Sequence, residues 1–422
     1  MSQFRIAIIG GGPAGLTLGL LLYRSGIPFA IFELRQKATD EELAKPSGML
    51  DLHEESGLAA IRECGLFDQF LHLTGECAET HKISDKDGNI LYTDEGGTNE
   101  RTEMRPEISR NALTKLLSSQ LPAECIRWEH RLVSVTSRTT PTGTENVLDF
   151  GSHGKQAFDL IVGADGAWSR VRSFLIDVEP QYAGTQSISM TIPQITANYP
   201  HLASFIGRGS FTALGLRHGI IVQRGPQDSA RVYIFFTTAE EHFAATLGLV
   251  GQTVADAKNL LLGSDVLLGH WGSAIKELVT VAYDAEFVDN PGASVDIKPL
   301  YMLPIGISWE HNVSATLIGD AAHLMCPWAG EGVNLALWDS LLLAHAIITA
   351  HETAGQDAIL LGSSLDWLIK GVEVELVERA KEKAEETYNN GQMLFGEDGA
   401  RAFADFFLNI PKADQYSSQV QS

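Results

Sequence analysis

The stretch that decides the fold is Ile6-Ala7-Ile8-Ile9-Gly10-Gly11-Gly12-Pro13-Ala14-Gly15. Its first four residues form a short, β-branched apolar run, which is typical of a strand buried on both faces of a sheet. Gly10, Gly12 and Gly15 follow in the Gly-x-Gly-x-x-Gly spacing that joins a strand to a helix in dinucleotide-binding folds. The stretch therefore predicts a nucleotide-binding turn at the start of a Rossmann-like domain.

The residues that follow complete a βαβ unit. Pro13 presets the backbone for a helix that we expect over Pro13–Ser25. The apolar run Phe29-Ala30-Ile31-Phe32 predicts a second strand, and Glu33 at its end is suited to hold the ribose hydroxyls of an adenosine. Gly12 lets the backbone approach a pyrophosphate, which the helix N-terminus attracts. This fingerprint by itself does not distinguish NAD from FAD.

A second motif, Leu-Ile-Gly-Asp-Ala-Ala-His-Leu-Met-Cys-Pro-Trp-Ala-Gly-Glu-Gly-Val-Asn, occupies residues 317–334. Asp320 follows an expected buried strand and is suited to bind a ribityl hydroxyl. Pro327 can flank a planar ring, while Gly330 and Gly332 let backbone N–H groups face a negatively charged atom such as reduced flavin carries. The alternative interpretation is a glycine-containing connection from strand to helix with a core histidine, His323.

A third motif, Asp159–Arg172, contains Asp165-Gly166 directly after the expected buried strand Leu160-Ile161-Val162. Taken alone, Asp165-Gly166 is more simply interpreted as a turn with exposed arginines beyond it.

The composition indicates a folded, acidic protein. The chain has 422 residues, with 31 Lys and Arg against 53 Asp and Glu, so its formal charge is 31 − 53 = −22. This charge disfavours nucleic acid and anionic membranes as partners. Hydrophobic residues make up 44% and charged residues 20%, as in an ordinary globular protein, and the length predicts two or three domains.

The chain shows no pattern for a metal site, a disulfide framework or a membrane segment. Its four cysteines are scattered without Cys-x-x-Cys spacing, which indicates a reducing compartment. The N-terminus enters the first strand without a secretory signal, and the most apolar stretches fall short of a membrane span. We therefore expect a cytoplasmic protein.

Together, the three motifs in this chain order resemble the FAD-dependent class A (aromatic-hydroxylase type) monooxygenases. Within that family, the sequence is most similar to the tetracycline-inactivating monooxygenases. The shared words are Gly48–Gly57, Pro106–Asn111 and Ile318–Asn334, and the resemblance covers nearly the whole chain. It implies an α/β fold in which a Rossmann-like FAD-binding domain carries an inserted mixed-sheet substrate domain and a long C-terminal helix.

The expected domain boundaries follow from the changes of pattern along the chain. The FAD-binding domain is expected over 1–75, 102–180 and 287–350, and the sheet domain over 76–101 and 181–286. Residues 351–410 are expected to be helical, and 411–422 to form a flexible tail. Apolar strand residues of the sheet domain are expected to cover a pocket for a planar substrate, on one face or the other: Val232, Ile234 and Phe236, or Tyr233 and Phe235. Any one of these residues is more simply explained as core.

The resemblance also implies which residues bind FAD. The expected set is Gly10, Gly12, Pro13, Ala14, Gly15, Glu33, Arg35, Asp51, Arg110, Asp165, Asp320, Gly330, Glu331, Gly332, Val333 and Asn334. Pro327, Trp328 and Gly330 are expected near the isoalloxazine ring. Arg110 offers a planar fork either to the cofactor or to Asp51, and Asp51 is equally suited to cap a helix.

Two departures from the related enzymes concern charge. The loop position at which they place an NADPH-contacting arginine falls here at Ala44, so Lys45 is the candidate, with Arg35, Lys37 and Arg105 as further sources of positive charge. Trp328 and Glu331 stand where the related enzymes show Phe and Gln, which places a larger ring and a negative charge beside the flavin.

The implied activity is hydroxylation of a planar aromatic or polyketide-like molecule, and the resemblance extends this class to molecules that resemble tetracycline. NADPH or NADH would reduce FAD, and O₂ would then form a flavin C4a-hydroperoxide that donates its distal oxygen. The cofactor carries this chemistry, so no catalytic acid or base is assigned. We expect a monomer or homodimer that acts on a small molecule. The alternatives are a flavin-dependent reductase or halogenase on the same scaffold, and a flavoprotein that only sequesters its ligand.

Overall fold

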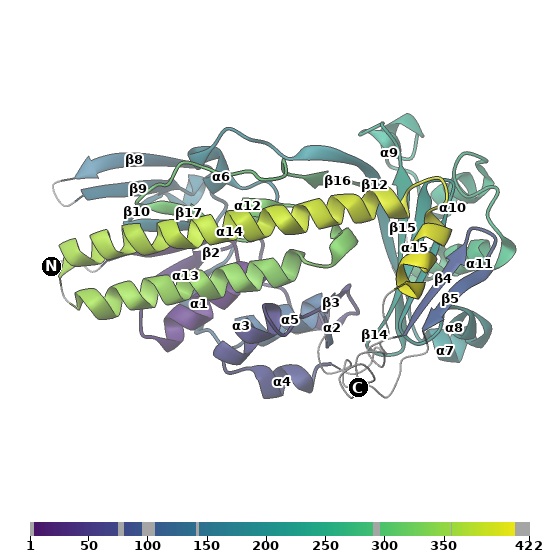
Figure 1. The fold of residues 1–422 in the computed structure, drawn as a ribbon, viewed down its shortest axis with the longest axis horizontal. Coiled ribbons are helices and arrows are strands. Elements are labelled where there is room, and N and C mark those ends of the chain that lie inside the picture. The colour runs from purple at the N-terminus through teal and green to yellow at the C-terminus, as the bar shows by residue number, and fades with distance from the viewer. Residues whose placement is uncertain are drawn as a thin grey trace, which may run out of the picture. The chain divides into compact units, whose positions relative to one another are not determined.

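The computed structural model describes residues 4–74, 80–94, 106–140, 143–289, 296–355 and 357–409 (Figure 1). The chain divides into two compact units, each assembled from three segments. The first unit comprises Met1–Gly75, Glu100–Ala183 and Tyr301–Tyr388, and the second comprises Glu76–Asn99, Gly184–Leu300 and Asn389–Ser422. Both units are therefore discontinuous in sequence. The expected tail over 411–422 lies outside the described residues.

The first unit contains a five-stranded sheet in the order β17-β11-β1-β2-β7, and every neighbouring pair in it is parallel. The strands are β17 (Ala315–Leu317), β11 (Leu160–Gly163), β1 (Ile6–Ile9), β2 (Phe29–Phe32) and β7 (Ile126–Arg127). β1, β11 and β17 are buried along their whole length, as expected for apolar strands covered on both faces. The strand β2 lies on one side of β1 and β11 on the other, so the strand order reverses beside β1. Ligands of such sheets bind at this reversal.

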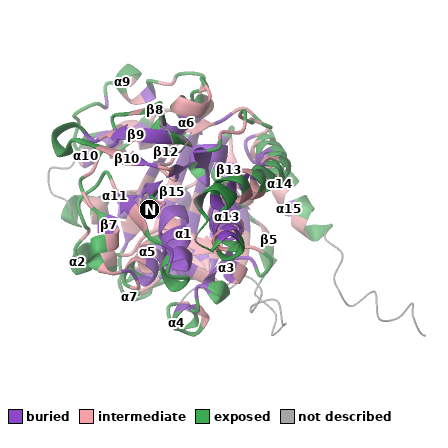
Figure 2. Cartoon of the chain, turned by 90° about the vertical axis from the view of Figure 1, so that its left-hand side faces the viewer, coloured by how far each residue is buried: buried purple, intermediate pink, exposed green. Residues whose placement is uncertain are grey.

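Two long helices pack in the core of the first unit. α1 (Pro13–Arg24) connects β1 to β2 and is buried from Ala14 to Leu22 (Figure 2). It contacts α13 (Gly332–Ala354), where the Ser340 hydroxyl donates to the Ala14 carbonyl at 2.9 Å. Among the described residues, α13 is the helix long and apolar enough to cross a membrane, but 67% of its most apolar window is buried within the protein. Such burial is typical of a core helix in a soluble fold.

The helix α14 (Ala358–Leu394) runs beside α13 (Figure 1). It is longer than the amphipathic helix that the residue pattern of Asp366–Asn390 predicts. It begins earlier because the Asp357 carboxylate accepts hydrogen bonds from the N–H groups of Ile359 and Leu360. The shorter helices of this unit are α2 (Asp40–Ala44), α3 (Gly57–Glu63), α4 (Phe67–Leu71), α5 (Arg110–Ser118), α6 (Arg170–Leu175) and α12 (Asp320–His323), with 3₁₀ turns at Ala123–Cys125, Gly151–His153 and Pro327–Ala329.

Two smaller sheets complete the first unit. β3 (Met49–Asp51) pairs antiparallel with β6 (Glu107–Ser109). The sequence pattern of Lys45–Gly57 predicts a loop followed by a helix and does not indicate this short strand. The other sheet has the order β10-β9-β8, formed by β10 (Lys155–Phe158), β9 (Gly143–Asp149) and β8 (Ser134–Thr140). The alternating pattern of Ile126–Arg138 and Asn146–Phe150 predicts antiparallel strands, and β8 and β9 do pair antiparallel. Ile126–Arg127 departs from this prediction, because it forms β7 of the parallel sheet.

The second unit contains a seven-stranded sheet in the order β16-β12-β15-β14-β13-β4-β5. Its strands are β16 (Lys298–Met302), β12 (Gln181–Ile192), β15 (Ser229–Thr237), β14 (His218–Gly225), β13 (Ser210–Gly215), β4 (His81–Asp85) and β5 (Ile90–Asp94). β13 pairs with β4 in parallel, whereas β12, β15, β14 and β13 pair antiparallel in turn. The expected mixed sheet is present.

The second unit also contains helices, although only a sheet domain was expected over 181–286. They are α7 (Ile195–Asn198), α8 (Pro200–Ile206), α9 (Phe243–Thr246), α10 (Val254–Gly263) and α11 (Ser273–Asp289). Apolar residues of α10 and α11 join the sheet in one buried cluster, which explains why these segments are helical. A further helix, α15 (Gly399–Leu408), packs on β4 and β5 through contacts of Phe407 with His81 and Tyr92.

Candidate functional site

The carboxyl ends of four parallel strands meet at one edge of the five-stranded sheet. Backbone hydrogen bonds join these ends from Gly10 N to Phe32 O (2.9 Å), from Ala164 N to Ile9 O (2.7 Å) and from Ile318 N to Gly163 O (2.9 Å). The three sequence motifs and Glu33 are therefore neighbours at this edge, although they lie far apart in the chain. This edge is also where the strand order reverses beside β1.

Each glycine of the first motif has its own geometry. Gly10 has φ +112°, and a Cβ there would lie 2.1 Å from the Ala164 carbonyl oxygen. A Cβ on Gly15 would lie 2.0 Å from the Gly10 carbonyl oxygen. In contrast, a Cβ on Gly12 would meet nothing within 4 Å. Gly10 and Gly15 are thus required by the turn and its packing, whereas Gly12 keeps space open at the start of α1.

Two helices begin at this edge without a side-chain cap. Gly12 precedes Pro13, the first residue of α1, and Glu331 precedes α13. Gly319 packs between the two helices. A Cβ on it would lie 3.2 Å from the Ala336 Cβ of α13 and 3.3 Å from the Ala14 Cβ of α1. Uncapped first-turn N–H groups carry the positive end of the helix dipole and are suited to bind anions or carbonyl oxygens.

Glu33 lies at the end of β2 with its carboxylate held by backbone groups. Its oxygens accept hydrogen bonds from Gly11 N at 2.6 Å and from Arg35 N at 2.9 Å. A carboxylate has about four lone-pair sites, so both oxygens can still accept a hydroxyl. The backbone contacts fix the carboxylate beside the glycine turn, whereas Arg35 itself is exposed.

A polar network that the sequence did not predict joins β3 to the start of α13. The His53 side chain, 2% exposed, has its Nε2 3.1 Å from Asp51 Oδ2 and its Nδ1 3.5 Å from Glu331 Oε2. The other oxygen of Glu331 lies 2.7 Å from Lys383 Nζ on α14. Burial disfavours ionisation of Glu331, but the hydrogen bonds from His53 and Lys383 outweigh it and lower its pKa.

Asn334 ties the same two segments together through their backbones. Its side chain accepts a hydrogen bond from His53 N at 2.9 Å and donates to the Asp51 carbonyl at 3.0 Å. Asn334 is fully buried, so its side chain is committed to these bonds. The expected cofactor contact at Asn334 can therefore come only from its backbone N–H.

Asp165 differs in its surroundings from the expected flavin contacts. Its carboxylate accepts hydrogen bonds from the Ser169 hydroxyl and from Arg170 N, so it holds the start of α6. Burial raises the pKa of this carboxyl group against the effect of those bonds. Asp165 thus has a structural role at the start of α6, and of the arginines beyond it Arg170 is exposed whereas Arg172 is buried.

Arg172 is 2% exposed, and its guanidinium joins the third motif to the second. It donates to the carbonyls of Ala167 (2.6 Å), Ala321 (3.0 Å) and Val178 (3.2 Å). Five guanidinium donors in a fixed plane can satisfy several carbonyls at once, which explains why an arginine is buried here.

The expected cationic residues lie on the surface. Arg110 begins α5, and among the described residues no hydrogen bond or ion pair to its guanidinium is formed. The fork expected from Arg110 to Asp51 is thus not present, because His53 occupies the Asp51 carboxylate instead. Lys45 ends α2 and is exposed, as are Arg35 and Lys37. Arg105 lies outside the described residues.

His323 is a buried structural residue, as the alternative interpretation of its motif predicted. Its Nε2 lies 2.6 Å from Asp339 Oδ2, and the same oxygen accepts a hydrogen bond from Gly319 N at 2.9 Å. The other oxygen of Asp339 accepts from Arg379 on α14. This cluster holds the backbone of Gly319 in the second motif in place.

The comparisons with known proteins agree with this geometry. The FAD binding domain family matches residues 3–248 and 310–364. The chain is 35% identical to the monooxygenase penA of Penicillium thymicola, over 94% of this chain and 97% of that protein. The chain belongs to the FAD-dependent monooxygenases of the aromatic-hydroxylase type.

Solved structures of FAD-dependent monooxygenases show the same fold. HpxO of Klebsiella pneumoniae, complexed with FAD and uric acid, aligns with a TM-score of 0.73 at 16% identity, over 98% of this chain and 95% of that one. The tetracycline destructase Tet(55) aligns with a TM-score of 0.62 at 17% identity, over 95% and 97%. The family expected from the sequence is confirmed, whereas identities this low show the fold alone.

The residues at the sheet edge of this monooxygenase fit an FAD molecule. The open space at Gly12 beside an uncapped helix start suits a pyrophosphate. The exposed Asp320 begins α12 next to Gly319, and among the described residues no hydrogen-bond donor occupies its carboxylate, which can therefore accept hydroxyl donors. Gly330 has φ +72°, and a Cβ on it would lie 3.4 Å from the Asp51 Oδ1. A glycine at this position therefore lets a cofactor approach the backbone.

The second unit of the monooxygenase resolves which residues of β15 are core. Val232, Ile234 and Phe236 are fully buried in the cluster with α10 and α11, so they are not available to a substrate. Arg231 and Tyr233 lie on the opposite face of the strand and are partly exposed, with Phe235 beside them. Arg231 donates there to the hydroxyls of Ser189 and Thr191.

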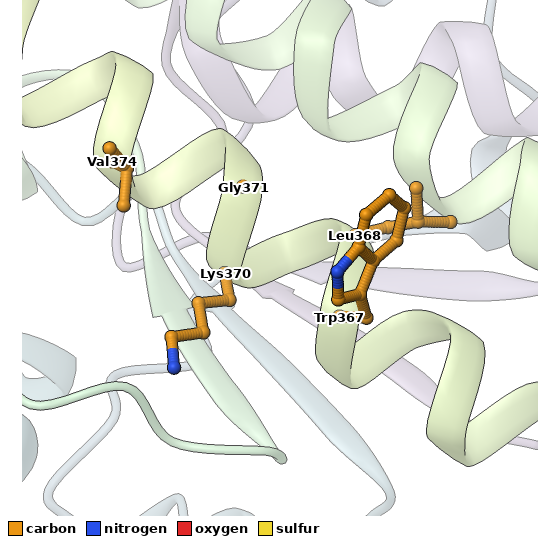
Figure 3. Close-up of a pocket in the computed structure, with 5 residues that line it drawn as sticks. All are labelled: Trp367, Leu368, Lys370, Gly371 and Val374. Atoms are coloured by element: carbon orange, nitrogen blue, oxygen red, sulfur yellow. The ribbon is translucent and has the colours of Figure 1, made fainter.

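A hollow of about 270 Å³ lies on the outer surface of α14 (Figure 3). It is lined by Trp367, Leu368, Lys370, Gly371 and Val374, all on that one helix. None of these residues belongs to the motifs or to the sheet edge. We therefore assign the hollow no part in the monooxygenase site.

Proposed function

We propose that this FAD-dependent monooxygenase uses NADPH or NADH and O₂ to hydroxylate a planar aromatic or polyketide-like small molecule. The observation that carries the proposal is the meeting of the three motifs at the edge of the parallel sheet beside β1. When bound, FAD supplies hydride acceptance and oxygen activation, which protein side chains alone do not provide. The protein's part is to bind, orient and shield.

The residues of the first unit have distinct roles in this proposal. The N-terminus of α1, with Gly12, Ala14 and Gly15, holds the pyrophosphate, and Glu33 accepts the adenosine ribose hydroxyls. Asp320 accepts hydroxyls of the ribityl chain. The backbone from Gly330 to Asn334 faces the flavin ring, with Pro327 and Trp328 on its approach.

The nicotinamide donor needs positive charge on a protein whose net charge is −22. Lys45 and Arg35 are exposed and are our candidates for its phosphates, with Arg110 available for either cofactor. A tetracycline-like substrate is included in the proposal because of the resemblance to that group and the fold shared with Tet(55). We further propose that the enzyme acts in the cytoplasm on a small molecule.

The proposal is tested with purified protein reconstituted with FAD. NADPH and NADH consumption is measured under ¹⁸O₂ with panels of phenols, indoles, polyketides and tetracyclines. We expect one class to accelerate consumption and to gain one labelled oxygen atom. An enzyme whose FAD neither donor reduces, with or without these compounds, would disprove the assigned donor. If NADPH or NADH consumption yields only hydrogen peroxide with every class of compound, the assigned substrate classes are wrong.

A further inference from the structure

Glu331 places a negative charge at the start of α13, where the proposed function puts the flavin ring. Glu331 is 8% exposed. It lies between Gly330 and Gly332, whose backbones are assigned to the flavin. An anion at this place is attracted to the positive end of the helix dipole and reduces the positive potential there. The structure shows that this charge does not stand alone.

Two side-chain nitrogen atoms face Glu331, one at each carboxylate oxygen. Lys383 Nζ lies 2.7 Å from Oε1, and His53 Nδ1 lies 3.5 Å from Oε2. His53 also meets Asp51 through Nε2 at 3.1 Å. Ionised carboxylates only accept hydrogen bonds, so His53 satisfies both neighbours when both of its ring nitrogens carry protons.

Asp51, His53, Glu331 and Lys383 thus form one cluster, in which the Lys383 ammonium group pairs directly with the Glu331 carboxylate. Lys383 also contacts Glu386, but that carboxylate is 46% exposed and screened by solvent. Burial works against the charge on Lys383, yet its bonds to Glu331 and Glu386 raise its pKa. Removing either partner of the Lys383–Glu331 pair therefore changes the net charge of a buried site by one.

We propose that Lys383 tunes the reduction of bound FAD by neutralising Glu331 at the N-terminus of α13, without itself contacting the flavin. This inference rests on the proposed function. Oxidised flavin is neutral and two-electron-reduced flavin carries a negative charge in water at neutral pH. A positive potential at the start of α13 favours the reduced form, and an uncompensated Glu331 disfavours it.

The inference makes predictions of opposite sign for the two partners. Lys383→Met leaves Glu331 with less compensation, and we expect it to weaken reduced FAD relative to oxidised FAD by roughly tenfold. For a two-electron couple this is a fall of about 30 mV in the midpoint potential. Glu331→Gln removes the anion and should raise the potential, while the double variant should return close to the wild-type value.

The measurement is a dye-equilibrated reduction titration of each FAD-loaded variant. Lys381→Met is the matched control, because Lys381 lies on the same helix but is paired with Glu385 and is 58% exposed. It removes the same charge and should leave the potential unchanged. Thermal unfolding without FAD shows whether each variant folds, and Glu331→Gln carries the test alone if Lys383→Met does not.

The possible outcomes separate the two ideas. A Lys383→Met potential equal to that of Lys381→Met, or a Glu331→Gln shift in the same direction as Lys383→Met, overturns the inference and leaves the proposed function standing. A wild-type protein that binds no FAD overturns the proposed function, and the inference with it.

Discussion

The Nε2 of His323 lies 2.6 Å from the Oδ2 of Asp339, and both side chains are buried beneath the Gly319 turn. Burial opposes both charges, but the attraction between them lowers the pKa of Asp339 and raises that of His323. Arg379 adds a second cation to the same carboxylate from α14. The Asp339 carboxylate on α13 thus holds three groups in place: the Gly319 backbone, the His323 ring on α12 and the Arg379 side chain on α14.

We expect Asp339→Asn to destabilise the protein strongly. The change leaves the Arg379 charge without its buried partner and weakens the bond to His323, and breaking such a pair typically costs about 3–5 kcal/mol. Chemical denaturation of the FAD-free protein measures the loss. Asp405→Asn, at an exposed position of α15, is the control and should change the free energy of unfolding by less than about 0.5 kcal/mol. Equal effects of the two changes would show that the cluster contributes little.

Gly12→Ala and Gly15→Ala should separate binding from folding. A Cβ on Gly15 would lie 2.0 Å from the Gly10 carbonyl oxygen, so this change should lower the stability of the FAD-free protein by at least about 2 kcal/mol. A Cβ on Gly12 meets no protein atom within 4 Å, and its backbone φ of −78° suits alanine.

Gly12→Ala should therefore fold normally and still weaken FAD binding by roughly tenfold or more, or about 1.4 kcal/mol. The measurements are the free energy of unfolding without FAD and the dissociation constant of FAD from flavin fluorescence. If Gly12→Ala binds FAD as tightly as the wild type, the pyrophosphate does not approach the backbone at this residue.

How much of the structure the sequence could predict depends on how far apart in the chain the interacting residues lie. The glycine turn, β1, α1 and β2 are fixed by neighbours within about one turn or one strand, so spacing alone identified them. The partners of His53 and Glu331 could not be found in this way. Asn334 lies 281 residues from His53, and Lys383, the partner of Glu331, belongs to a helix that looked only amphipathic. Arg172 looked like a surface residue because its acceptors are backbone carbonyls, which have no sequence signature.

The helices α10 and α11 were missed for a related reason. Their apolar residues face a sheet, and the loop signals around them resemble those of strands. The burial of Val232, Ile234 and Phe236 could be decided only when these helices were seen on one face of β15.

Stability should decrease as the pH rises through the range where His311 loses its proton. Burial disfavours the imidazolium of His311, but bonds to Glu373 (2.6 Å) and Asp366 (2.9 Å) on α14 outweigh burial and raise its pKa. The folded state then binds the proton more tightly than the unfolded state, whose pKa is about 6.5. The stabilisation is complete below that pH and is lost as the pH rises through the higher folded value.

The check is the free energy of unfolding between pH 5.5 and 8.5 for the wild type and for His311→Gln. All other titratable groups are the same in the two proteins, so the difference between the two curves isolates His311. That difference should shrink with rising pH. A constant difference would mean that His311 does not hold its proton more tightly in the folded protein.

Asp320→Ala should weaken FAD binding without unfolding the protein. Asp320 is exposed at the start of α12, so its loss breaks no buried contact among the described residues. A hydrogen bond to a charged group contributes about 1.5–3 kcal/mol, which corresponds to a rise of roughly 10- to 100-fold in the FAD dissociation constant. Asp320→Asn keeps one acceptor oxygen and should lie between the two. Glu378→Ala removes an exposed carboxylate on α14 and should leave FAD affinity unchanged. Full flavin occupancy of Asp320→Ala at the wild-type affinity would show that this carboxylate does not hold the ribityl chain.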